Sequence, residues 1–158
     1  MFPRSVFPNT AQVNTEGQLV IGGCNTLDLA SEFGTPVYIL DEQTLRSRCR
    51  SFVSEFQKRH PATQVAYASK AYINPALARI FQEEGLGLDV VSGGEFAIAR
   101  SVDFPLEKVY FHGNNKTPEE LSEAVEHRIG YVVVDSFHEL NLLNSIAATA
   151  GITQDILI

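Results

Sequence analysis

A repeat of short apolar runs and amphipathic segments constrains the fold of this chain more than any other feature. Runs with strand character begin near Gln64, Gly87, Lys108, Tyr131 and Asp155, about 21 to 24 residues apart. Strands that alternate with helical segments at such regular spacing predict an α/β fold, with a parallel sheet and the helices outside it. The spacing alone does not decide whether the sheet stays open or closes into a barrel.

The helices of the repeat have recognisable first turns. Asn74-Pro75 combines an N-cap residue with proline at the first helical position. Ser92, Thr117 and Ser136 are each followed three residues later by a glutamate, which is the spacing of a capping box. We therefore expect a helix to begin directly after each of these four polar residues.

The sequence before the repeat is less regular. Residues 18–21 predict a short strand, residues 27–33 a short helix and residues 35–40 another strand. Asp41 is placed to cap a long helix with an apolar stripe, and His60-Pro61 is expected to end it. We take residues 1–34 as an N-terminal segment that precedes the repeating part, residues 35–158.

Composition excludes several classes of function. Nineteen acidic residues against twelve basic ones give a formal net charge of −7, which argues against a nucleic-acid partner. No apolar run approaches the roughly 20 residues of a membrane span. The two cysteines, Cys24 and Cys49, have no metal-like spacing, so no metal site is predicted and a cytoplasmic location is the default.

Lys70 is the first candidate for chemistry. It ends the apolar run Gln64 to Ala68, which is typical of a buried strand, and lysine is rarely buried. Desolvation disfavours a charged amine, and a neutral amine can attack a carbonyl carbon to form a Schiff base. The alternative is a lysine whose stem packs on apolar surface while its ammonium reaches water.

Two further candidates follow the next strands of the repeat. Asp89 lies in the run Leu86 to Ser92, and neighbouring strands are about 5 Å apart, so its carboxylate could face Lys70 or a cationic part of a ligand. His112 ends the strand that follows, at the edge where a barrel carries its active site. Alternatively, both side chains bond to local backbone near strand ends.

Gly93-Gly94 invites comparison with a phosphate-binding loop, because it follows a strand and opens a helix. Its spacing matches neither the dinucleotide nor the Walker fingerprint. A tight strand-to-helix turn closed by the capping box of Ser92 and Glu95 is the favoured interpretation.

Three stretches resemble one known family in their order and spacing. They are YASKA at residues 67–71, LDVVSGGE at residues 88–95 and YFHGNNKTPEEL at residues 110–121, and residues 17–50 resemble the amino-terminal region of the same family. That family is diaminopimelate decarboxylase, a group of pyridoxal-phosphate enzymes with an alanine-racemase-like barrel. The resemblance implies that residues 35–158 form the first half of a (β/α)₈ TIM barrel. A complete barrel needs about 250 residues, so we expect a truncated, N-terminal part of a longer enzyme.

The resemblance also implies the chemistry. Lys70 would hold pyridoxal 5′-phosphate covalently, Asp89 and His112 would lie beside the cofactor, and the full-length enzyme, a homodimer, would decarboxylate meso-diaminopimelate to L-lysine. In that family the phosphate loop and most substrate contacts come from later sequence, so this chain alone is expected to be inactive. Two alternatives stay open: a decarboxylase of ornithine, lysine or carboxynorspermidine, and a non-catalytic half-barrel fragment.

Overall fold

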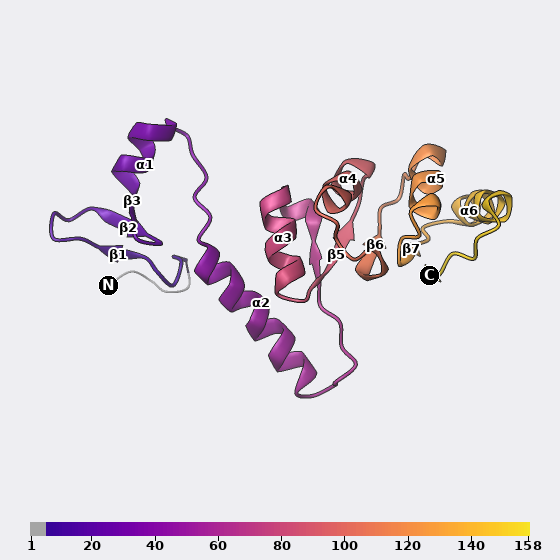
Figure 1. Ribbon diagram of the computed structural model, residues 1–158, viewed down its shortest axis with the longest axis horizontal. Coiled ribbons are helices and arrows are strands. Elements are labelled where there is room, and N and C mark those ends of the chain that lie inside the picture. The colour runs from indigo at the N-terminus through magenta and orange to yellow at the C-terminus, as the bar shows by residue number, and fades with distance from the viewer. Residues whose placement is uncertain (1–5) are drawn as a thin grey trace. The chain divides into compact units, whose positions relative to one another are not determined.

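The computed structural model describes residues 6–158, and these divide into two compact units with their boundary between residues 54 and 55. Each unit has its own sheet (Figure 1). Within the described residues, no helix is both long enough and apolar enough to cross a bilayer. The boundary expected between residues 34 and 35 stays a prediction, because compactness alone does not mark the start of a family domain.

The first unit is built on an antiparallel sheet in the order β1-β2-β3, followed by two helices. The short strand and the short helix expected from the sequence are present as β2 and α1, whereas β1 and β3 were not predicted. Asp41 caps the long helix, because its Oδ2 accepts from the backbone N–H of Thr44 at 3.1 Å. The elements are β1 (Gln12–Val13), β2 (Leu19–Ile21), β3 (Cys24–Asn25), α1 (Thr26–Phe33) and α2 (Glu42–Gln57).

One expectation for this unit is wrong. The segment Thr35 to Leu40 forms no strand, although its residues favour extended backbone. No strand within residues 6–158 pairs with it, and Tyr38 is 98% exposed. An extended segment without a neighbouring strand lacks the hydrogen-bond ladder that defines a sheet, so propensity alone did not suffice.

The second unit confirms the predicted α/β architecture. Five parallel strands lie in the order β4-β5-β6-β7-β8, and one α-helix joins each strand to the next (Figure 1). Every strand begins within two residues of its expected position, and the four expected N-caps are observed. The elements are β4 (Ala66–Ala68), η1 (Ser69–Ala71), α3 (Pro75–Glu83), β5 (Gly87–Val90), α4 (Gly93–Ser101), η2 (Leu106–Lys108), β6 (Val109–Phe111), α5 (Pro118–Glu126), β7 (Tyr131–Val133), α6 (Phe137–Ala150) and β8 (Ile156–Leu157).

The core of this unit lies between the sheet and its helices. Alternate strand residues point to that side and are fully buried, and the ring of Phe96 in α4 stacks on Phe111 at 6.3 Å between centroids. The buried strand residues are Leu88, Val90, Val109, Phe111 and Val132. Because successive strand residues face opposite sides, the residues between them lie on the other face of the sheet, away from the helices.

Candidate functional site

A hollow of about 290 Å³ lies where the strands of the second unit end. Its size is close to the lower end of ordinary ligand clefts, about 300–1,000 Å³. Four neighbouring strands supply its lining, so residues far apart in sequence meet at one edge of the sheet. The lining residues are Lys70, Asp89, Val91, His112, Gly113, Asn114, Val133, Val134 and Asp135.

Strand register explains why the three predicted residues meet there. Asp89 is paired with Ala68 on one side and with Tyr110 on the other, so these three residues form one row across the sheet. His112 follows that row by two residues along a backbone that still pairs with β5, and a step of two returns to the same face. Lys70 lies in the turn directly after β4, at the same end of the strands. All three predicted site residues line the one hollow at that end of the strands.

Lys70 itself is not placed as the sequence predicted. Strand β4 ends at Ala68, and Lys70 lies in the short 3₁₀ turn that follows, where it is exposed. The expectation of a buried strand was wrong because β4 is an edge strand, and its residues are only partly covered. Within residues 6–158, no carboxylate pairs with the Lys70 amine. The amine is therefore accessible to a ligand in the hollow.

Asp89 and His112 form a pair in the wall of the hollow. His112 Nδ1 lies 3.0 Å from Asp89 Oδ1, and the tautomer decides which atom carries the shared proton. The backbone N–H of His112 donates to the carbonyl of Val90 at 2.8 Å, which fixes the end of β6 beside β5. Asp89 thus orients His112 rather than pairing with Lys70.

The glycine pair at the start of α4 is a capping turn, as the sequence favoured. Ser92 Oγ accepts from the backbone N–H of Glu95 at 3.3 Å. The backbone N–H of Gly93 donates to Glu120 Oε1 at 2.7 Å, so a carboxylate of the protein already occupies the site that an anion would take. A Cβ on Gly93 would lie 3.2 Å from the side chain of the same glutamate, so a larger residue there would press against it.

Sequence reasoning missed part of the wall. Asn114 and Asp135 line the hollow, and Lys116 forms a buried ion pair with Glu139 directly behind it. Glu139 was visible as a capping-box residue, but nothing in the sequence separates Lys116 from an ordinary loop lysine. Only the folded chain places both in one cluster.

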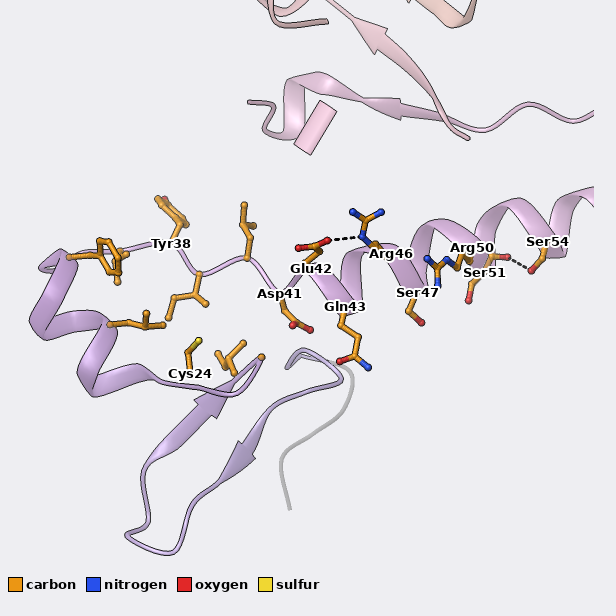
Figure 2. Close-up of a pocket in the computed structure, with 17 residues that line it drawn as sticks. Cys24, Tyr38, Asp41, Glu42, Gln43, Arg46, Ser47, Arg50, Ser51 and Ser54 are labelled. Atoms are coloured by element: carbon orange, nitrogen blue, oxygen red, sulfur yellow. Dashed lines mark hydrogen bonds and ion pairs between the residues drawn. The ribbon is translucent and has the colours of Figure 1, made fainter. Parts of the chain in front are cut away.

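A larger hollow, of about 1220 Å³, lies in the first unit between α2 and the segment that follows α1 (Figure 2). Size does not make it the better candidate. Glu42 and Arg46 in its wall pair with each other at 2.8 Å along the helix, and its lining contains neither a lysine nor a histidine. The smaller hollow combines an accessible amine with an acid–histidine pair, which is a set that can do chemistry.

The residues of the smaller hollow fit a pyridoxal cofactor. A primary amine that is exposed and unpaired can bond the aldehyde of such a cofactor. The pair of Asp89 and His112 supplies a carboxylate and a ring beside the amine, in a hollow large enough for a small planar ligand. None of these residues is a cradle for phosphate, since the nearby start of α4 is occupied by Glu120.

Comparison with known families agrees with this donor set. The family model for the pyridoxal-dependent decarboxylases, pyridoxal binding domain, matches residues 42–158. The chain belongs to that family of pyridoxal-dependent decarboxylases.

Individual relatives show which decarboxylases the chain is similar to. The chain is 47% identical over 152 residues to diaminopimelate decarboxylase of Bacillus methanolicus, covering 96% of this chain and 35% of that protein. The crystal structure of diaminopimelate decarboxylase from M. jannaschii superposes with a TM-score of 0.83 at 34% identity, covering 94% of this chain and 35% of that one. Ornithine decarboxylase of Entamoeba histolytica, at 22% identity and a TM-score of 0.58, shares the fold. The chain thus spans about a third of the length of the relatives it matches.

Proposed function

We propose that this chain is the cofactor-binding part of a decarboxylase that converts meso-diaminopimelate to L-lysine. The observation that carries the proposal is the unpaired amine of Lys70 in a hollow shared with Asp89 and His112. The support for the substrate is the similarity to diaminopimelate decarboxylases, at 47% identity for one relative.

In this proposal Lys70, Asp89 and His112 have different roles. Lys70 would supply the amine that holds the cofactor, by condensing with its aldehyde and releasing water. Asp89 holds His112 through the 3.0 Å contact and places negative charge beside the cofactor ring. His112, which lines the hollow, would lie beside the cofactor ring. When bound, pyridoxal phosphate supplies the electron-accepting ring that makes loss of carbon dioxide possible.

A covalent trap tests the attachment. The protein is mixed with pyridoxal phosphate, reduced with borohydride and mapped by peptide mass. We expect the label on Lys70 in the wild type, none there in Lys70→Ala, and none in Lys70→Arg, because a guanidinium stays protonated and does not condense with an aldehyde. Lys58→Ala, which removes an exposed lysine, should label like the wild type. A label on other lysines with Lys70 unmodified would contradict the proposal.

The substrate needs a separate test. Decarboxylation of a different basic amino acid, such as ornithine, lysine or carboxynorspermidine, remains the main alternative. The codons that follow Ile158 should first be read, and the product of the whole reading frame assayed for carbon dioxide release from each candidate. Faster release from ornithine than from meso-diaminopimelate would reject the substrate assignment while leaving the role of Lys70 intact.

We further propose that the complete enzyme acts in the cytoplasm as a homodimer, with residues 1–34 ahead of a barrel domain that begins at residue 35. The support is the family resemblance of residues 17–121. Sedimentation of the product of the whole reading frame tests the dimer, and a monomer that is fully active would contradict it.

A further inference from the structure

The ammonium of Lys116 is enclosed behind the hollow. Its side chain is only 1% exposed, and three acceptors surround its Nζ. These are the backbone carbonyl of Gly113 at 2.5 Å, the backbone carbonyl of Val133 at 2.9 Å and Glu139 Oε1 at 2.9 Å. An ammonium has three N–H donors, so each has one acceptor.

Glu139 fixes the other end of this cluster. Its side chain is 7% exposed, and its backbone N–H donates to Ser136 Oγ at 3.2 Å as part of the first turn of α6. The same carboxylate oxygen lies 3.4 Å from the backbone nitrogen of Asp135, which donates to it. The pair therefore joins the end of β7 to the start of α6.

The two carbonyls that Lys116 binds belong to the wall of the hollow. Gly113 follows His112 in the turn after β6, and Val133 ends β7; both line the hollow with Lys70. Gly113 has φ +104, and a Cβ there would lie 3.1 Å from the carbonyl oxygen of Val91, so the turn it makes is tightly confined. The pairing of β6 with β7 ends at Phe111 and Val132. Lys116 therefore links the turn after β6 to the end of β7, past the last paired residues.

Stability does not explain such a pair well. Removing two charges from water is costly, and a buried ion pair is often no more stabilising than apolar residues of the same size. A fully satisfied buried cluster does restrict its neighbours to one arrangement. We therefore expect the pair of Lys116 and Glu139 to fix the positions of the neighbouring turns more than it adds to the free energy of unfolding.

We propose that Lys116, together with Glu139, is a positioning residue for the cofactor hollow. It holds the carbonyls of Gly113 and Val133, and through them it sets the distance between the wall bearing His112 and the turn after β7. This proposal rests on the proposed function only where it concerns the cofactor; the link between the two turns is a property of the chain alone.

The test compares the double variant Lys116→Met/Glu139→Gln with the wild type. The double change leaves no unpaired buried charge, so the variant is expected to fold. Lys116→Arg gives a second variant that keeps the charge but whose planar guanidinium does not match three acceptors around one nitrogen. Lys58→Met is the control, because it breaks a surface pair with Glu55 outside the hollow.

Amide hydrogen exchange measures whether Lys116 holds the turn after β6 and the end of β7 in place. The backbone N–H of His112 bonds Val90 and that of Val134 bonds Leu157, so both report on the two turns. We expect both to exchange at least about tenfold faster in the double variant, with amides of β5 unchanged. Unchanged exchange at His112 and Val134, or equal loss of protection across the whole sheet, would overturn the proposal.

Cofactor titration separates this proposal from the proposed function. We expect the dissociation constant of pyridoxal phosphate to rise about tenfold or more in the double variant and to stay within about twofold in Lys58→Met. Equal affinity in wild type and double variant would overturn the positioning role and leave the function standing. If the wild type does not attach pyridoxal phosphate at Lys70, the proposed function fails, and the exchange result alone decides the role of Lys116.

Discussion

Where the strands of the parallel sheet begin, backbone packs directly on backbone; where they end, carboxylate side chains fill the gaps between turns. At the beginning, a Cβ on Gly87 would come within 2.5 Å of the carbonyl oxygen of Lys108, and one on Gly130 would contact the carbonyl of Glu107. Contacts this close leave no room for a ligand.

The other edge is built from side chains. Glu95 Oε2 accepts from the backbone N–H of Val91 at 2.8 Å, and Glu120 accepts from Gly93 and from its own N-cap, Thr117. These side chains hold the turns that follow the strands, and the hollow with Lys70 lies among those turns. The close backbone packing that stabilises the sheet thus lies where the strands begin, and the candidate site lies where they end. The same division is general in barrel enzymes.

The largest effect on stability should come from the edge where the strands begin. Gly130→Ala is expected to lower the free energy of unfolding by about 1–3 kcal/mol, because the new methyl group meets the rigid backbone of Glu107. Gly94→Ala is the matched control, with no heavy atom closer than 3.8 Å, and should be neutral or stabilising by up to about 1 kcal/mol. Urea unfolding measures both. Equal stability of Gly130→Ala and the wild type would show that the backbone at Glu107 can move away from residue 130 at little cost.

A cap at the opposite edge should matter less. Ser136→Ala removes the oxygen that accepts from the N–H of Glu139, and a loss of about 1 kcal/mol is expected. Ser145 lies within the same helix and only bonds back to the carbonyl of Asn141, so Ser145→Ala should change stability by less than about 0.5 kcal/mol. If the two variants unfold at the same urea concentration, the first turn of α6 is not held by its cap.

Asp89→Asn should separate chemistry from stability. The amide still fills the space and can still bond His112, so the free energy of unfolding should change by less than about 1 kcal/mol. The fraction of Lys70 trapped with pyridoxal phosphate by borohydride should fall about tenfold, because the negative charge beside the cofactor is gone. Asp103→Asn, at an exposed turn with φ 54 that asparagine tolerates, should change neither quantity. Unaltered trapping in Asp89→Asn would remove Asp89 from the site.

The smallest effect concerns pH. Burial raises the pKa of Tyr110 above its ordinary value of 10.0, and the neighbouring Tyr131 raises it further. Because the folded protein holds this proton more tightly than the unfolded chain, the associated stability is present below about pH 10 and is lost as pH rises above it. As the pH is raised above 10, the free energy of unfolding should therefore fall less in Tyr110→Phe than in the wild type. Urea unfolding at a series of pH values measures this difference. Tyr38→Phe, at an exposed tyrosine, should behave as the wild type.

Local signals predicted most of the fold. The caps Asn74, Ser92, Thr117 and Ser136 start their helices as expected, because a short polar side chain that satisfies the first amides acts within one turn. The segment Thr35 to Leu40 was mispredicted for the opposite reason, since a strand depends on a neighbour that a local pattern does not supply.

The three residues that the sequence singled out line one hollow, but the contacts among them were not predictable from the sequence. Lys70, Asp89 and His112 were singled out because each lies within or just after a strand of the repeat. That Asp89 bonds His112, and that Lys116 is buried behind them, depends on register and on the turns after β6 and β7. Those contacts are non-local, and the sequence pattern carries no separate signal for them.

The carboxylates at the helix starts also affect which ligand the hollow can distinguish. Glu120 occupies the start of α4, and the first turns of α5 and α6 carry their own glutamates, so these helix dipoles are already neutralised within the chain. This chain should therefore discriminate poorly between pyridoxal and its phosphate ester. Competition between the two aldehydes for borohydride trapping at Lys70 should give nearly equal labelling, whereas strong preference for the ester would reveal a phosphate contact among these residues.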